Sequence, residues 1–197
     1  MFLVSITVHE FAHAVIAKRM GDDTAQKMGR LTLNPFKHAD LIGTLVMPLA
    51  SFASGFALIG WAKPVPIDRR KFKNHMRDDA LVSFAGPASN FLLAVVFFII
   101  FFITYHGSAS HYIVNLFWYG VFFNIFLFVF NLLPFPPLDG SHILFDIFPN
   151  KITAKLLSLG LYGSIFLLIF IYSPLWGYFM DLVNFILGLF LKSAGLK

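Results

Sequence analysis

The chain has 197 residues, of which 58% are hydrophobic, 18% aromatic and 13% charged, and its formal net charge is +5. Soluble domains contain about 25% charged residues, so this composition excludes an ordinary soluble protein, a disordered chain and a nucleic-acid-binding domain. The sequence has no cysteine, which excludes disulfides and thiolate metal sites. It therefore predicts an integral membrane protein that contacts the lipid bilayer and no nucleic acid.

Six apolar stretches approach the roughly 20 residues that a helix needs to cross a bilayer. They comprise residues 2–17, 41–61, 81–105, 112–133, 152–172 and 175–191. The predicted fold class is an all-α polytopic membrane protein with about five transmembrane helices and a re-entrant helix/β-hairpin segment at 41–67. We expect a single domain over residues 1–197, with core motifs at 9–144 and C-terminal helices at 152–191.

The 15 Lys and Arg residues predict the orientation, because cytoplasmic loops beside membrane helices are enriched in both. They follow the first two stretches, precede the fifth or end the chain, whereas segments 106–111 and 173–174 contain none. In the cell membrane, the basic loops and the C-terminus would be cytoplasmic and the N-terminus outside. Both flanks of the second stretch are basic, which favours re-entry over the alternative of a full crossing with one basic loop outside.

The first stretch contains the pattern His9-Glu10-Phe11-Ala12-His13. Positions i and i+4 share one face of a helix, so both imidazoles can bind one ion with Glu10 beside them. Two neutral imidazoles suit zinc, and the adjacent carboxylate can accept a proton from the water that zinc activates. Ionisable residues in an apolar helix are costly unless they are paired, so we interpret this pattern as functional.

A third ligand is needed, because a catalytic zinc usually has three protein ligands and one open position. Glu10 is the only glutamate, so the third ligand must be an aspartate or a histidine. Most of these residues fall in polar loops, whereas Asp139 follows three prolines at the end of the fourth stretch. Unwound segments at membrane depth usually face a cavity, which favours Asp139. Asn131, just before the prolines, either reaches that cavity or bonds to another helix.

Taken together, these residues resemble the site-2 protease family of intramembrane zinc metalloproteases, in its short prokaryotic branch without a PDZ or regulatory domain. The resemblance covers residues 9 to about 144. It rests on His9-Glu10-x-x-His13, Gly86-Pro87-Ala88-Ser89-Asn90, and the run from Asn131 through Leu138-Asp139-Gly140. From the residues themselves, we interpret Gly86, Pro87 and Asn90 as packing positions at a tight helix crossing.

The resemblance implies a set of site residues. One Zn²⁺ per chain would be held by His9, His13 and Asp139. Glu10 would be the catalytic acid and base, and Asn131 would lie near the substrate or its oxyanion. These assignments predict a zinc metalloendopeptidase.

The resemblance also implies that a hairpin of Lys63, Pro64, Val65 and Pro66 presents an edge to an extended substrate. The expected function is hydrolysis of peptide bonds in or near transmembrane segments of membrane-protein substrates, as in regulated intramembrane proteolysis. Two alternatives are a cation-binding membrane transporter and a catalytically inactive zinc-binding scaffold. A transporter does not account for a carboxylate between two metal ligands, and carriers usually contain a repeated pair of broken helices.

Overall fold

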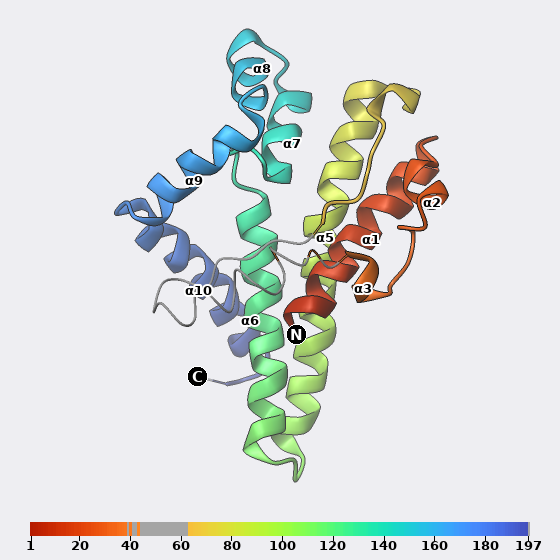
Figure 1. Cartoon of the computed structure of the whole chain (residues 1–197). Coiled ribbons are helices and arrows are strands. Elements are labelled where there is room, and N and C mark those ends of the chain that lie inside the picture. The colour runs from red at the N-terminus through yellow and green to blue at the C-terminus, as the bar shows by residue number, and fades with distance from the viewer. Residues whose placement is uncertain (39, 41–42, 44–62, 197) are drawn as a thin grey trace.

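The computed structural model describes residues 1–38, 40, 43 and 63–196 (Figure 1). The regular secondary structure of these residues is helical, without strands. The α-helices are α1 (Phe2–Arg19), α2 (Thr24–Lys27), α3 (Pro35–His38), α5 (His75–His106), α6 (His111–Asn131), α7 (Asp139–Ile147), α8 (Lys151–Leu157), α9 (Gly163–Ile171) and α10 (Leu175–Ser193). Two short 3-10 helices are η2 (Arg69–Lys71) and η3 (Gly160–Tyr162).

The described residues confirm the expected all-helical class with membrane-spanning helices, but not the expected number of five. Helices α5, α6 and α10 are long and apolar enough to cross a bilayer, and the bent pair formed by α8 with η3 and α9 adds a fourth candidate if it counts as one span. Helix α1 is less apolar, because its 18 residues include Glu10, Lys18 and Arg19. The re-entrant segment expected at 41–67 lies largely outside the described residues.

The fifth apolar stretch departs from the expectation of one continuous helix. The segments Lys151–Leu157 and Gly160–Ile171 are bent by 87° relative to each other. Gly160 has a φ of +50°, in the left-handed region that interrupts a right-handed helix and suits glycine. Apolar length alone does not reveal such a bend, because it does not report the backbone conformation at Gly160.

Helices α5 and α6 lie side by side as a long hairpin, with α1 against α5 and with α9 and α10 on the other side of α6 (Figure 1). One hydrophobic core joins α5, α6 and α10. Its buried residues are Ala94, Phe97, Val121, Ile125, Val129, Phe179, Val183 and Leu187. This packing joins α5 to α6 and α10, while the neighbouring part of α5 contacts α1.

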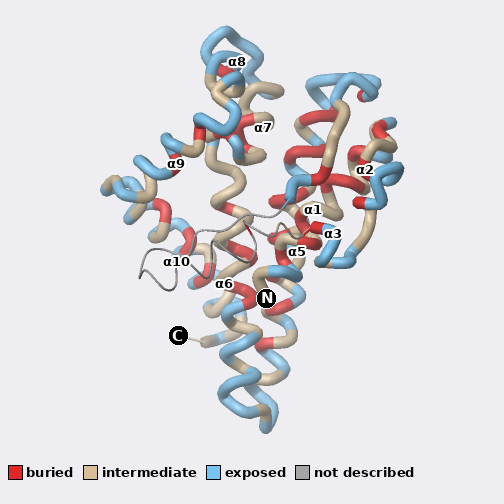
Figure 2. The backbone as a smooth tube through the Cα atoms, viewed as in Figure 1, coloured by how far each residue is buried: buried red, intermediate tan, exposed pale blue. Residues whose placement is uncertain are grey.

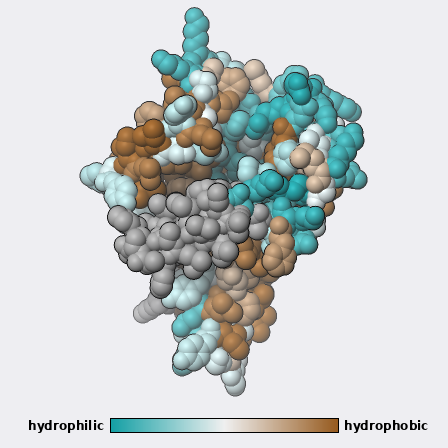
Figure 3. All heavy atoms as spheres, viewed as in Figure 1, coloured by the Kyte–Doolittle hydropathy of each residue, from teal (hydrophilic) through white to brown (hydrophobic). Residues whose placement is uncertain are grey.

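Buried and polar residues are distributed unevenly along the molecule. Many of the buried segments in Figure 2 lie on α1 and on the half of α5 beside it. In Figure 3, hydrophilic side chains gather over α2 and the segment leading to α5, whereas hydrophobic side chains cover much of the lower α5–α6 hairpin. The polar end of the molecule is therefore the end at which α1 and α2 meet the start of α5.

The α5–α6 crossing depends on a small residue at position 120. A Cβ atom added to Gly120 would lie 2.9 Å from the Phe97 ring, whereas one added to Gly188 on α10 would meet nothing within 4 Å. We expect Gly120→Ala to lower the thermal unfolding temperature of the detergent-solubilised protein, because overpacking costs about 1–3 kcal/mol. The matched control Gly188→Ala should not lower it. Equal transitions for the two variants would contradict this account of the crossing.

Candidate metal and active site

Two histidines of α1 and an aspartate of α7 meet at one point. His9 and His13 lie one turn apart on α1, and Asp139 is the first residue of α7. The two Nε2 atoms are 3.0 Å apart, and Asp139 Oδ2 lies 3.2 Å from that of His9 and 3.4 Å from that of His13. Both histidines are buried. The structure thus brings together the three residues that the sequence singled out as ligands.

The spacing of these atoms fits a zinc ion. Nitrogen and oxygen ligands about 2.0–2.2 Å from a tetrahedral zinc lie roughly 3.3–3.5 Å from one another, close to the separations observed here. Asp139 Oδ2 is buried and has no hydrogen-bond donor among the described residues, so a bound cation would compensate its charge. Two imidazole nitrogens and one carboxylate oxygen also leave a fourth position for water or substrate.

Helix α5 lies directly against the two imidazoles. His9 Nδ1 is 2.6 Å from Asn90 Oδ1, and His13 Nδ1 is 2.7 Å from the Val82 carbonyl oxygen. A Cβ atom at Gly86 would lie 2.6 Å from His9 Cε1 and still closer to His13 Nε2. The sequence interpretation of Gly86 and Asn90 as packing positions was therefore incomplete, because this crossing packs against the candidate ligands themselves.

Asp139 is placed by the break between α6 and α7. Leu138 occupies the N-cap position of α7, so Asp139 lies in the first turn, where the helix dipole favours a carboxylate. Gly140 packs so closely on this break that an added Cβ would overlap the carbonyl groups of Leu132 and Leu133. The small size of Gly140 is thus needed for close approach within α7, a helix that the sequence analysis did not predict.

A strap formed by residues 63–72 reaches Glu10. The Val65 N–H donates to Glu10 Oε2 at 2.7 Å. Val65 is buried against Ala14 and Ala25, which fixes the strap to α1 and α2. The contact holds one oxygen of the Glu10 carboxylate while this side chain lines the same cavity as His9.

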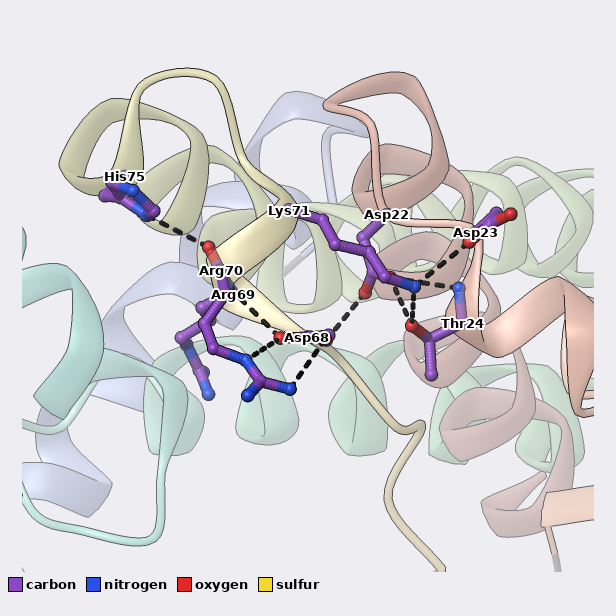
Figure 4. Close-up of polar contacts among 8 residues, drawn as sticks. All are labelled: Asp22, Asp23, Thr24, Asp68, Arg69, Arg70, Lys71 and His75. Atoms are coloured by element: carbon purple, nitrogen blue, oxygen red, sulfur yellow. Dashed lines mark hydrogen bonds and ion pairs between the residues drawn. The ribbon is translucent and has the colours of Figure 1, made fainter.

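The far end of the strap is anchored through Asp22, which is fully buried after the end of α1 (Figure 4). Asp22 accepts a hydrogen bond from the Asp68 N–H at 2.7 Å, and Lys71 Nζ lies 3.3 Å from it. Thr24 donates to it from its backbone N–H and its hydroxyl. Burial opposes ionisation, but the bonds from Thr24, Asp68 and Lys71 outweigh it and hold the pKa of Asp22 below its ordinary value.

The first strap residues are not paired in a sheet in the described part of the chain. The Lys63 N–H donates to the His38 carbonyl at 2.9 Å, and the Val65 N–H is taken by Glu10. Pro64 and Pro66 have no N–H. Residues 63–66 therefore offer no free N–H to a substrate strand, and an edge here would have to bind through carbonyl oxygens.

Asn131 ends α6 beside the site. Its Nδ2 donates to the Leu127 carbonyl of its own helix at 3.0 Å, so that donor is engaged within α6 rather than with another helix. The side chain nevertheless lines the cavity that contains His9 and Asp139. The structure thus places Asn131 at the cavity wall.

Two cavities meet at these residues. The first has a volume of about 270 Å³ and is lined by His9, Glu10, His13, Pro64, Val65, Ile67, Arg69, Ser83, Asn131, Pro137, Asp139 and His142. The second, of about 550 Å³, shares several of these residues and adds mainly apolar ones. Its additional residues are Phe2, Ile6, Leu127, Phe130, Leu138, Leu161 and Ser164. A polar chamber therefore adjoins an apolar one at His9 and Glu10.

A charged network at the cavity wall was missed by the sequence analysis. Arg69 Nε lies 2.7 and 2.8 Å from the two carboxylate oxygens of buried Asp79, and Arg69 Nη2 is 3.3 Å from His142 Nε2. The sequence interpretation placed Asp79 in a polar loop, because no periodic signal links it to Arg69 or to α7. A possible signal was the three-residue spacing from Asp139 to His142, which puts both on one face of a helix.

Asp146 extends this network along α7. Its Oδ2 is buried and has no hydrogen-bond partner among the described residues. Burial raises the pKa of Asp146 to about 7, with repulsion from Asp79 adding to the increase and attraction to Arg69 opposing it. The folded protein therefore binds this proton more tightly than the unfolded chain does.

Comparison with known proteins agrees with a helical membrane protein that carries a zinc-peptidase site. The family model for peptidase family M50 matches residues 1–107 and 103–171. Two curated relatives carry the name "Putative zinc metalloprotease". YwhC of Bacillus subtilis is 43% identical over 182 residues, covering 89% of this chain and 80% of that protein. Rip2 of Mycolicibacterium smegmatis is 36% identical over 146 residues, covering 71% of this chain and 52% of that protein.

No solved structure matches the chain. The family match covers well over half of it, so the chain belongs to peptidase family M50, the site-2 protease family. It is a zinc metalloprotease, and the predicted enzyme class and zinc cofactor are confirmed at the level of the family.

The pKa of Asp146 predicts a pH-dependent stability. An acid whose pKa is raised by folding contributes fully below its unfolded pKa of about 4, and that contribution is lost as the pH rises through about 7. Asp146→Asn cannot ionise, so its unfolding temperature relative to wild type should increase between pH 5 and pH 8. Thermal unfolding in detergent at both pH values measures this difference. A difference that does not change with pH would contradict the assignment.

Proposed function

We propose that this chain is an intramembrane zinc endopeptidase that hydrolyses peptide bonds in or near transmembrane segments of membrane-protein substrates, in regulated intramembrane proteolysis. His9, His13 and Asp139 hold one zinc ion, and Glu10 is the catalytic acid and base. The observation that carries the proposal is the meeting of three ligand atoms within 3.0–3.4 Å of one another, beside Glu10 and in a cavity.

In the proposed hydrolysis, zinc, Glu10 and Asn131 have different roles. Zinc, when bound, polarises the scissile carbonyl and makes water acidic enough to lose a proton near neutral pH. Glu10, held through one oxygen by the Val65 N–H, accepts that proton and later delivers it to the leaving amine. Asn131 lies at the cavity wall, where its amide can contact the substrate or the oxyanion. Each group is fixed by the fold before the substrate arrives.

The adjoining cavities support a substrate that is both apolar and extended. Side chains of a membrane segment suit the larger cavity, with its apolar lining from Phe2, Ile6 and Phe130, and the peptide bond belongs in the polar one. A substrate helix must unwind first, because its amides are already hydrogen-bonded. The edge formed by Lys63, Pro64, Val65 and Pro66 can hold such a chain only through strap carbonyls, since its N–H groups are engaged.

The alternatives account for less. A cation transporter would explain a buried metal site, and an inactive scaffold would explain a bound zinc. Neither requires Glu10 to be held by Val65 in the cavity next to two imidazoles. Membership of a peptidase family and the two relatives named as zinc metalloproteases also favour hydrolysis.

For the membrane arrangement, we propose a single catalytic domain with about five transmembrane helices and a re-entrant segment at 41–67. The cationic segments around α2, the strap and α8 would face the cytoplasm, and the N-terminus and the α5–α6 turn would lie outside. Lys192 and Lys197 favour a cytoplasmic C-terminus by the same rule. In Figure 1, α10 runs from the side of α9 toward the α5–α6 turn. The side of the C-terminus is measured separately below.

Substitution of Glu10 separates metal binding from catalysis. We expect purified wild-type protein and Glu10→Gln to bind about one zinc ion per chain, with cleavage of a single-span membrane substrate reduced by about 10²–10⁴-fold in the variant. Asp139→Asn should lose zinc as well as activity. Asp181→Asn, the same change on an exposed position of α10, is the matched control and should retain both.

Zinc content measured by elemental analysis and cleavage measured on gels decide the outcome. Undiminished cleavage by Glu10→Gln would overturn its catalytic role, and undiminished zinc content in Asp139→Asn would overturn its role as a ligand. Zinc binding without cleavage by the wild type, across substrates with Gly, Pro or Asn near the scissile bond, would favour the scaffold.

The absence of cysteine makes the orientation measurable. We expect a membrane-impermeant thiol reagent to label Ser108→Cys, in the exposed α5–α6 turn, in intact cells. Lys73→Cys should be labelled only after the cells are permeabilised, because its loop would be cytoplasmic. Ser193→Cys, at the end of α10, reports the side of the C-terminus. Labelling of Lys73→Cys in intact cells would reverse the proposed orientation.

A further inference from the structure

Asn90 on α5 belongs to a buried chain of polar side chains that begins at His9. The Asn90 Oδ1 atom is 2.6 Å from His9 Nδ1, and Asn90 Nδ2 donates to Asn124 Oδ1 at 3.0 Å and to the Ser5 carbonyl at 3.2 Å. Asn124 Nδ2 in turn donates to the Gly120 carbonyl at 2.8 Å. Ser5, Asn90 and Asn124 all have 0% exposure, so water does not compete for these bonds.

The direction of this chain is determined at its far end. The carbonyl oxygens of Gly120 and Ser5 can only accept, so they fix which end of each amide carries the NH₂ group. The Oδ1 atom of Asn90 then faces His9 and can only accept a hydrogen from its Nδ1. A neutral His9 must consequently carry its hydrogen on Nδ1, which leaves the Nε2 lone pair facing His13 and Asp139.

His13 receives the equivalent contact from the same face of α5. Its Nδ1 lies 2.7 Å from the Val82 carbonyl, which also can only accept. Val82, Gly86 and Asn90 are spaced by four residues, so they form one stripe along the helix. Two members of the stripe orient the imidazoles, and the third, Gly86, provides the space for both rings.

We infer that Asn90, oriented by Asn124 and the Ser5 carbonyl, is a positioning residue that sets the tautomer of His9 and thereby the zinc affinity of the site. This inference rests on the proposed metal site and extends it to a residue that contacts neither metal nor substrate. Outer partners that orient a ligating histidine typically change metal affinity by about 10–100-fold when they are removed.

The test measures zinc affinity rather than proteolysis. Wild-type full-length protein and three variants are purified in detergent, and the zinc dissociation constant is determined by competition with a chelator at one pH. Asn90→Leu, which removes the acceptor but keeps the branching and the number of side-chain heavy atoms, should weaken binding by about 10–100-fold. Asn90→Asp keeps an oxygen for His9 and should stay within a few-fold of wild type. Ser89→Ala is the matched control, because within the described residues the Ser89 hydroxyl donates only to the Gly86 carbonyl oxygen of its own helix.

Thermal unfolding of the same zinc-free samples distinguishes positioning from packing. Asn90→Asp puts carboxylate oxygens against the Ser5 carbonyl and Asn124 Oδ1, so it should unfold at a lower temperature than wild type. Positioning is supported if Asn90→Asp keeps its zinc affinity although it is less stable, while Asn90→Leu loses zinc affinity. Zinc affinity that is equal in all variants, or that falls only in step with unfolding temperature, overturns the inference.

A second readout uses the unmodified chain and does not depend on whether the variants fold. Nitrogen-15 NMR of histidine-labelled, zinc-free protein should show neutral His9 with its hydrogen on Nδ1. The opposite tautomer overturns the inference even if zinc binds. Wild-type protein that binds no zinc overturns both the proposed function and the inference, whereas zinc binding with the opposite tautomer overturns the inference alone. The two failures are therefore distinguishable.

Discussion

The close crossing of α1 and α5 is the constraint on which the site depends. Two imidazoles are buried there in an apolar bundle, and each buried nitrogen needs a partner. The Nδ1 atoms of His9 and His13 contact Asn90 and the Val82 carbonyl, and their Nε2 atoms face Asp139. These contacts require α1 and α5 to come so close at Gly86 that even a Cβ atom there would overlap the imidazole rings. The same close crossing therefore packs the two helices and provides the hydrogen-bond partners of both imidazoles.

The strap connects this buried site to the polar end of the molecule. The Val65 N–H holds Glu10, while charged and hydroxyl groups near Asp22 hold the far end of the strap. Surface ion pairs contribute little to stability when isolated, but buried Asp22 is the centre of a cluster with several donors. The candidate general base is thus oriented by a segment whose anchors lie outside the apolar core.

Helical periodicity and apolar length predicted most of the scaffold, because they depend on local sequence. They placed α1, α6 and α10 within two residues of their observed bounds and put His9 and His13 on one face, whereas α5 begins at His75, six residues before the predicted start. They did not predict α7 or the bend between α8 and α9, since turn conformation and packing decide both. The contact of Asn90 with His9 was also missed, because the two residues are 81 positions apart. Periodicity shows which residues share a face of a helix, but not which other helix packs against that face.

The sequence by itself determined that the chain belongs in a bilayer and carries two imidazoles and a carboxylate within one helical turn, because composition and i, i+4 spacing are local properties. It also narrowed the third ligand to Asp139, because acidic residues are rare in so apolar a chain. Only the tertiary structure decided that Asp139 reaches both histidines, that Val65 holds Glu10 and that α5 orients the imidazoles. Those contacts join residues distant in sequence, and their geometry follows from how the helices pack.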